Sequence, residues 1–276
     1  MSVGNAISMG TPPRRTDSGN APGRLFSGFA WLVYGFLYLP IFVVIIYSFN
    51  SARFTTRWEH FTLDWYKTLL TNTPLIDAAC NSLMVAVTAA TLATILGGLA
   101  ALCLRRYRFT GRSALFACIY ILTVSPDIVM GISLLIFFIA CNFPLGFWAL
   151  VIAHTTLALP FVALTVKARM AEFDESLLEA SRDLGATEFG AYRHILLPLI
   201  APALGAGWLL SFTLSLDDVM ISIFVTNPPF EVLPVKLYSM VRLGVKPDIN
   251  ALSAIMFAVT LLCIGLAQFL MRIRRR

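Results

Sequence analysis

Six hydrophobic runs, separated by short polar loops, divide most of the chain. Each run predicts a membrane-crossing helix. The runs cover residues 25–47, 82–104, 114–141, 147–166, 198–216 and 251–271. Most approach the roughly 20 residues that a helix needs to cross about 30 Å of hydrocarbon. The pattern therefore predicts an all-α polytopic membrane protein with six transmembrane helices.

Two of these runs are irregular. Pro126 interrupts the third run, and the fifth run is short, with the apolar residues 221–225 as a candidate extension. Residues 1–24 are rich in Pro, Gly and Ser, a composition that favours disorder. The pattern thus predicts a disordered N-terminal extension over 1–24 and a membrane domain over 25–273.

Composition supports lipid as the solvent of this chain. Hydrophobic residues make up 58% of it and charged residues only 13%, with a mean hydropathy of +0.78. An ordinary soluble domain has about 25% charged residues. A soluble fold of this composition would have too little polar surface to face water.

The positive charges predict how the chain lies in the membrane. The net charge is +6, and most of the Lys and Arg residues fall in short clusters beside hydrophobic runs. Such clusters carry topology information, which disfavours a nucleic-acid partner. One side of the membrane collects Arg14, Arg15, Arg24, Arg105, Arg106, Arg108, Arg112, Lys167, Arg169, Arg182, Arg193, Arg272, Arg274, Arg275 and Arg276. That side is predicted to be cytoplasmic, with both termini on it.

Motifs for chemistry are sparse. Neither an H-E-x-x-H zinc motif nor a G-x-x-x-x-G-K-[ST] phosphate loop occurs. The five cysteines form no C-x-x-C pair, which disfavours a disulfide or a metal site. His154 lies in a mostly apolar run and is predicted to be a packed residue hydrogen-bonded to a neighbouring span. No cofactor is therefore expected in this chain, and it is not expected to hydrolyse ATP by P-loop chemistry on its own.

The segment EASRDLGATEFGAYRHILLP, residues 179–198, is a polar stretch between two hydrophobic runs. Residues 172–184 predict an amphipathic helix. Its expected apolar face consists of Leu177, Ala180, Ser181 and Leu184, with Leu178 at the edge. Gly185 then predicts the helix end. Thr187 predicts the cap of a second helix with Glu188 in its first turn, and Pro198 opens the next span. An ordinary cytoplasmic loop stabilised by its own charge pairs is the alternative.

Three carboxylates lie in or beside membrane runs, where charges are costly and often functional. They are Asp127, Asp217 and Asp218. An unpaired acidic group on a translocation path would favour a cation. Asp127 could instead cap a half-helix after Pro126. Asp217 and Asp218 could lie in the headgroup zone, cap a following helix, or pair with basic residues of the last outer loop, namely Arg242 or Lys236.

The polar segment resembles the EAA loop of ABC importer permeases. The matching residues are Glu179, Ala180, Ser181, Gly185, Ile195, Leu197 and Pro198, with Ser181 where the family has a second alanine. The resemblance implies that the loop 172–198 is a coupling element that docks on an ATPase subunit. The residues implied to carry this coupling are Glu179, Ala180, Ser181, Asp183, Leu184, Gly185 and Ala186.

Further stretches resemble permeases of spermidine/putrescine ABC importers, specifically the second of their two membrane subunits. These stretches are residues 46–54, 125–135, 145–148, 159–162, 211–219 and 233–252, and the similarity extends over about 25–273. The resemblance implies a type I ABC importer permease fold and a non-catalytic subunit in the bacterial inner membrane. The implied partners are a homologous permease in a heterodimer, two ATPase subunits that bind ATP and Mg, a periplasmic polyamine-binding protein and membrane lipid.

Other functions remain open at this point. A permease of the same class could carry an opine, an amino-acid derivative or ferric iron. A secondary transporter would show inverted repeats with paired broken helices, and only one clear proline break is present. An intramembrane enzyme would need a nucleophile and a base, or a metal site, within the spans.

Overall fold

The computed structural model describes residues 21–52, 57–172, 174, 176–243 and 247–273. Helices dominate this part of the chain, and its only β-pairing is two isolated bridges. In chain order the helices are α1 (Ala21–Tyr47), α2 (Asp64–Thr71), α3 (Thr73–Arg106), α4 (Arg112–Val124), α5 (Asp127–Ala140), α6 (Phe147–Ala171), α7 (Ser176–Asp183), α8 (Glu188–Ala191), the π-helical turn η1 (Tyr192–Leu196), α9 (Leu197–Asp217), α10 (Met220–Val225), α11 (Leu233–Leu243) and α12 (Pro247–Ile273).

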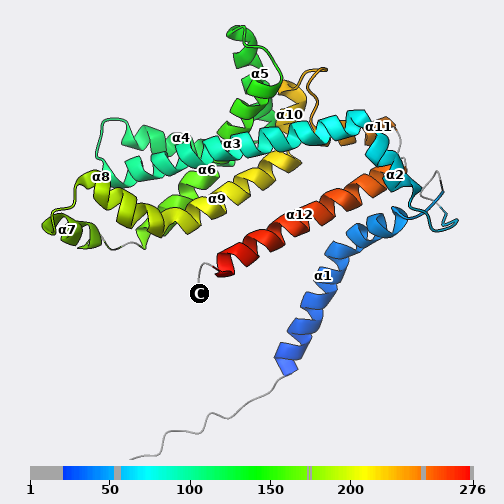
Figure 1. Cartoon of the computed structure of the whole chain (residues 1–276), viewed down its shortest axis with the longest axis horizontal. Helices are drawn as coiled ribbons and strands as arrows, with labels where there is room; N and C mark the ends of the chain where they lie inside the picture. The colour runs from blue at the N-terminus through cyan, green and yellow to red at the C-terminus, as the bar shows by residue number, and fades with distance from the viewer. Residues whose placement is uncertain (1–20, 53–56, 173, 175, 244–246, 274–276) are drawn as a thin grey trace, which may run out of the picture.

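A three-helix core forms where α3, α6 and α9 lie side by side (Figure 1). Small residues bring these helices close together. A Cβ atom on Gly97 of α3 would lie 2.9 Å from the carbonyl oxygen of Leu159 in α6, and one on Gly207 of α9 would lie 3.2 Å from Val162. Because lipid provides no hydrophobic drive between helices, close packing of this kind is a main source of their association.

The third predicted span is broken. Residues 114–141 were expected to form one interrupted span, whereas α4 and α5 are separate helices bent by 117° at Ser125 and Pro126. Pro126 has no N–H to donate, and its ring disfavours the helical region for Ser125, which is extended. Figure 1 shows α5 projecting away from the core, beside α10.

Four helical stretches are long and apolar enough to cross a membrane, and the bent pair α4–α5 would make a fifth. Three of the four, residues 26–47, 73–106 and 147–171, match predicted runs, and the fourth joins α8, η1 and α9 over 188–217. The last predicted span corresponds to α12, whose described apolar part is shorter, over 249–259. The count of six spans is therefore met only when the bent pair and α12 are each counted as one.

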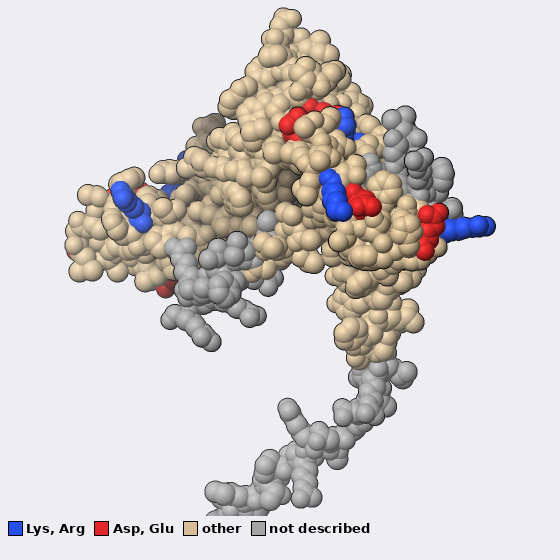
Figure 2. All heavy atoms as spheres, turned by 45° about the vertical axis from the view of Figure 1, so that its right-hand side comes forward, with Lys and Arg blue, Asp and Glu red and all other residues tan. Residues whose placement is uncertain are grey.

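The ends of the core differ from its middle. Charged side chains are few on the face in Figure 2, where the blue and red groups form small separate spots among wide stretches of other residues. Helices α7 and α8 lie at one end of the core, and α2 and α11 lie at the other (Figure 1). Helix α1 begins at Ala21, four residues before the predicted boundary, and residues 1–20 lie outside the described residues.

Candidate functional site

Two places carry polar side chains in positions that the sequence singles out. The first is the polar arm, defined here as residues 176–196, which comprises α7, α8 and η1 at one end of the core. The second is the acidic junction, defined here as residues 125–127 and 215–222, where α4 meets α5 and α9 meets α10.

Local hydrogen bonds start and stop the first helix of the polar arm. The side chain of Asp174 accepts a hydrogen bond from the backbone N–H of Ser176 at 3.0 Å, which lowers the pKa of the Asp174 carboxyl below its ordinary value. At the other end, Gly185 adopts φ +84°. Its N–H bonds the carbonyl of Arg182 at 2.8 Å, and the N–H of Ala186 bonds that of Ser181 at 3.0 Å. This pair of bonds is a Schellman motif, which confirms the predicted helix end at Gly185.

The second helix of the arm begins at a side-chain cap. Thr187 Oγ1 accepts a hydrogen bond from the backbone N–H of Gly190 at 3.1 Å, which confirms the predicted cap. Glu188 lies in the first turn, as predicted, and its Oε1 is 3.4 Å from Arg106 of α3 and 3.5 Å from Arg182 of α7. The arm is thus a stiff helix–turn–helix that continues through η1 into α9.

Helix α7 buries only part of its predicted apolar face. Leu178 and Ser181 are buried, and the Ser181 hydroxyl donates to the Leu178 carbonyl at 2.8 Å. Leu178 packs in the cluster that includes Met170 and Leu196. Leu177, by contrast, is exposed, and Leu184 is 89% exposed. The predicted apolar face is therefore mostly exposed, since among its members only Ser181 is buried, and the contact with the core is made by Leu178 at its edge.

The predicted coupling residues therefore divide into one buried and several exposed positions. Ser181 faces the core, in a site where a small side chain fits between α7 and its neighbours. The exposed ones are Glu179, Ala180, Asp183, Leu184, Gly185 and Ala186. Together with Phe189, which is 73% exposed, they form a surface with apolar side chains that no other described residue covers.

Asp127 and Asp217 are the open carboxylates of the acidic junction. Asp127 is the first residue of α5 and is exposed, and no side chain caps this helix. Asp217 is the last residue of α9 and is also exposed. Gly131, about one turn after Asp127 in α5, lies against Met220 and Ile221 at the start of α10, about one turn after Asp217. The chain bend at Pro126 and the end of α9 therefore bring to one junction the segments that carry two acidic residues 90 positions apart in sequence.

Asp218 is not an open carboxylate. Its Oδ2 accepts hydrogen bonds from the backbone N–H of Ser222 at 2.9 Å and from the Ser222 hydroxyl at 3.0 Å, and its Oδ1 accepts from the N–H of Ile221 at 3.3 Å. These bonds satisfy first-turn donors of α10. The alternative reading of Asp218 as the cap of a following helix is the one that the structure supports.

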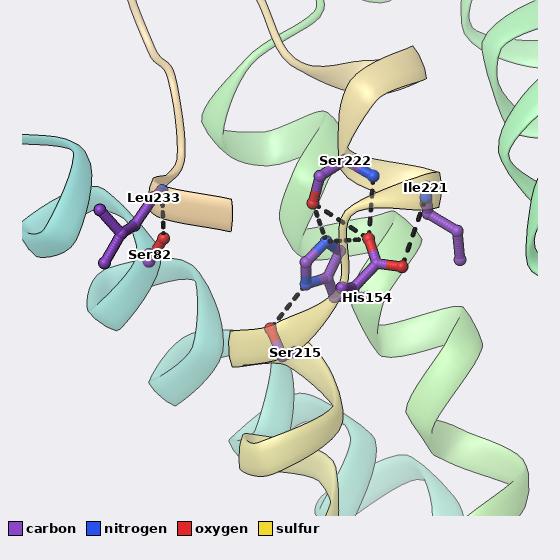
Figure 3. A network of polar contacts seen from close by, with 7 residues as sticks. Ser82, His154, Ser215, Ile221, Ser222 and Leu233 are labelled. Carbon is purple, nitrogen blue, oxygen red and sulfur yellow. Dashed lines mark hydrogen bonds and ion pairs between the residues drawn. The ribbon is translucent and has the colours of Figure 1, made fainter. Parts of the chain in front are cut away.

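His154 completes this buried network, as Figure 3 shows for its labelled residues. Its Nδ1 is 2.6 Å from the hydroxyl of Ser215 in α9, and its Nε2 is 3.0 Å from that of Ser222 in α10. Nε2 also lies 3.5 Å from Asp218 Oδ2. His154 is 1% exposed, which confirms the prediction of a packed histidine bonded to a neighbouring helix.

The sequence reading missed Ser215 and Ser222. The available signal was their nearness in sequence, because Ser215 and Ser222 lie three residues before Asp218 and four after it. The expected alternative pairing of the acidic residues with the outer loop is also absent among the described residues. Lys236 binds Glu231 at 2.7 Å, and Arg242 lies over the ring of Tyr238.

Comparison with known proteins gives consistent similarities. Residues 93–276 match the family described as binding-protein-dependent transport system inner membrane component. The spermidine/putrescine transport system permease protein PotC of Escherichia coli (strain K12) is 49% identical over 251 residues, covering 91% of this chain and 95% of PotC. The putrescine transport system permease protein PotI of the same strain is 40% identical over 247 residues, covering 87% and 88%.

Solved structures resemble the fold. A bacterial ABC transporter involved in the import of the acidic polysaccharide alginate superposes with a TM-score of 0.69 at 17% identity, covering 90% of this chain and 98% of that chain. An amino acid ABC transporter superposes with a TM-score of 0.59 at 20% identity, covering 76% and 99%. These similarities confirm the predicted all-α permease fold.

Proposed function

Because this chain belongs to the family of binding-protein-dependent transport system inner membrane components, we propose that it is a permease subunit of an ATP-driven polyamine importer. In this role it forms half of the translocation path for spermidine and putrescine. The observation that carries the proposal is that two exposed carboxylates, Asp127 and Asp217, lie at the acidic junction, where α5 packs on α10. The identity to PotC and PotI supports the choice of solute.

The chemistry of the solute matches this pair. A polyamine carries two or three ammonium groups on an apolar methylene stem, so it needs separated carboxylates and apolar walls. Asp127 and Asp217 come from different helices, and neither forms an ion pair within the described part of the chain. Each is thus available to a cation from outside. Asp218 contributes indirectly, because it holds α10 against α6 and thereby fixes the end of α9 that carries Asp217.

The polar arm supports coupling to a separate ATPase subunit. Its apolar side chains Leu177, Leu184 and Phe189 are exposed on the same arm as Glu179, and the part of the chain that the structure describes does not cover them. The arm continues into α9 without a loop, so a push on α7 and α8 would move α9 as a rigid body. ATP and Mg then bind the ATPase subunits, and this chain is non-catalytic.

The remaining parts of the proposal concern assembly. The chain pairs with a homologous permease in a heterodimer, and two ATPase subunits bind at the polar arms. A periplasmic polyamine-binding protein delivers the solute at the opposite end. The positive charges beside the runs place both termini in the cytoplasm of a bacterial cell, with the helices in its inner membrane.

The test is uptake by the reconstituted importer carrying Asp127→Asn or Asp217→Asn. Each variant should raise the KM for spermidine about tenfold or more, because losing one charge contact with a desolvated cation costs at least about 1.4 kcal/mol. Asp77→Asn, which neutralises an exposed carboxylate on α3, is the matched control and should leave the KM unchanged. An unchanged KM in both variants would remove these residues from the path.

The same preparation decides between solutes. Uptake of labelled spermidine is measured in competition with putrescine, an opine, an amino-acid derivative and ferric iron. Only the polyamines should compete. Competition by one of the other solutes, together with indifference to polyamines, would refute the substrate while leaving the permease role intact.

A further inference from the structure

A basic cavity lies where three helices meet at the arm end of the core. It is lined by Leu104, Arg112, Ser113, Phe116 and Lys167 and has a volume of about 300 Å³. Leu104 belongs to the last turns of α3, Lys167 to those of α6, and the other three to the first turns of α4. Residues far apart in sequence thus converge on one space that the transport mechanism does not use.

Arg112 is held in place while most of its donors stay free for a ligand. Its Nε donates to the carbonyl oxygen of Leu104 at 3.0 Å. A guanidinium has five donors in a fixed fork that matches the oxygens of a phosphate, and this bond uses one of them. Arg112 forms no ion pair among the described residues.

A second cation faces the same space. The Nζ atom of Lys167 lies 3.8 Å from the centroid of the Phe116 ring, a contact that positions the ammonium group without neutralising it. Lys167 likewise has no ion pair in the part of the chain that the structure describes, and no acidic side chain lines the cavity. Two uncompensated positive charges therefore share one opening.

The start of α4 adds to the positive potential. Gly111 precedes the helix with φ 102°, and no side chain caps it in the described structure. The first backbone N–H groups of a helix have no partner within it, and the positive end of the helix dipole lies there. Ser113, in this first turn, places a hydroxyl at the cavity wall.

The other side of the cavity is apolar and continues along a membrane helix. Leu104 and Phe116 form its apolar wall, and Phe116 packs on Tyr120 at 4.6 Å between ring centroids. Tyr120, Ile121 and Val124 of α4 are exposed beyond it. A ligand suited to this site has a phosphate at one end and hydrocarbon at the other. We propose that the basic cavity binds the phosphate headgroup of an anionic phospholipid, whose acyl chains lie along α4.

The test is native mass spectrometry of the full chain in detergent, titrated with phosphatidylglycerol and, separately, with phosphatidylcholine. The double variant Arg112→Gln with Lys167→Gln should weaken phosphatidylglycerol binding about 30-fold, because each basic residue near a membrane surface contributes about 1 kcal/mol. Phosphatidylcholine binding should change little. Arg112→Lys keeps the charge but removes the guanidinium fork. Its affinity for phosphatidylglycerol should therefore lie between that of wild type and that of the double variant.

A matched control distinguishes lipid binding at this cavity from a general effect of the positive charge of the protein. Arg108→Gln with Arg193→Gln removes the same charge from two exposed positions outside the cavity and should retain phosphatidylglycerol binding. Equal losses in the two double variants, or equal binding of both lipids by wild type, would overturn the proposal. Displacement of the lipid by millimolar inorganic phosphate would assign the site to free phosphate instead. Unchanged unfolding temperatures without lipid verify that the variants are folded.

Discussion

The three-helix core and the polar arm differ in how far their side chains are buried. In the core, Ala86, Ala89 and Ala93 of α3 are fully buried, and glycines allow α6 and α9 to approach to van der Waals contact. In the arm, Leu184 and Phe189 are almost fully exposed, and only Leu178 and Ser181 of α7 are buried. The core helices pack closely against one another, whereas the arm leaves apolar side chains uncovered by the described residues. Substitutions should therefore damage folding in the core and coupling in the arm.

The largest expected effect is in the core. Gly97→Leu places a Cβ atom 2.9 Å from the Leu159 carbonyl oxygen and 2.8 Å from Val162, so the α3 and α6 backbones must separate. We expect a loss of about 3 kcal/mol or more in stability, at the upper end for overpacked sites. Thermal unfolding monitored by size-exclusion chromatography measures it.

Gly205→Leu is the matched control for this substitution. Gly205 lies on α9 with open space around its Cβ position, so the same side chain should be tolerated there. Similar losses of stability at both positions would show that leucine destabilises these helices wherever it is placed. The close approach of α3 and α6 would then not be what holds the core together.

The second effect belongs to the arm and should leave the core intact. Gly185→Pro fixes φ near −65°, whereas the residue needs +84°, and it removes the N–H that bonds Arg182. The turn between α7 and α8 should be lost, and polyamine uptake should fall below about a tenth of wild type, the equivalent of 1.4 kcal/mol in coupling. Uptake by the reconstituted importer and co-purification of the ATPase subunit measure this.

Gly185→Asn distinguishes backbone conformation from the mere presence of a side chain. Asparagine tolerates the left-handed region, so this variant should keep most of the uptake. The unfolding temperature of both variants should stay near that of wild type, because the core is untouched. Normal uptake by Gly185→Pro would contradict the role of the arm as a stiff lever.

The comparison also explains what could be predicted from the sequence. The end of α7 at Gly185 and the cap at Thr187 were predictable, because caps depend on residues within one turn. The buried face of α7 was not, because Leu178 is selected by contacts with Met170 and Leu196, which are distant along the chain. The local sequence of the arm therefore predicts where its helices end, but it does not predict which side chains are buried by contacts with distant residues.

Prolines in the apolar runs also show that local sequence alone does not predict whether a helix bends. Pro126 and Pro160 both lie in apolar runs, yet the chain bends by 117° at Pro126 and continues as helix α6 through Pro160. Pro160 is buried in α6, which packs against both α3 and α9, and packing of this kind is where membrane helices tolerate an internal proline. Likewise, the three acidic residues were predictable as a group, but their division into open Asp217 and capping Asp218 needed the position of His154.

The third prediction tests whether the buried hydrogen-bond network around His154 contributes to stability alone or also to the acidic junction. His154→Ala leaves Ser215, Ser222 and Asp218 without a shared partner in a buried site. Unpaired buried polar groups cost about 1–3 kcal/mol, so we expect a loss of about 2 kcal/mol in stability. Because Asp217 adjoins this network, the KM for polyamine should rise more than kcat falls.

The control for His154 is Thr156→Ala on the same helix. The Thr156 hydroxyl bonds only the Ile152 carbonyl of its own helix, so its loss should change neither stability nor the KM appreciably. Uptake kinetics and thermal unfolding are measured on both variants. A drop in stability with an unchanged KM would make His154 a packing residue only and would separate it from the solute path.

The smallest expected effect concerns the ion pairs that join the arm to the core. Glu188→Gln removes the contacts of Glu188 with Arg106 and Arg182, which are 3.4 and 3.5 Å long and largely exposed. Such pairs contribute about 0–1 kcal/mol, so α7 amides should exchange hydrogen no more than about fivefold faster. Added salt should weaken the wild type more than the variant, because it screens exposed charges. Much faster exchange, comparable with unfolding of α7, would mean that charge pairs rather than Leu178 and Ser181 attach the arm to the core.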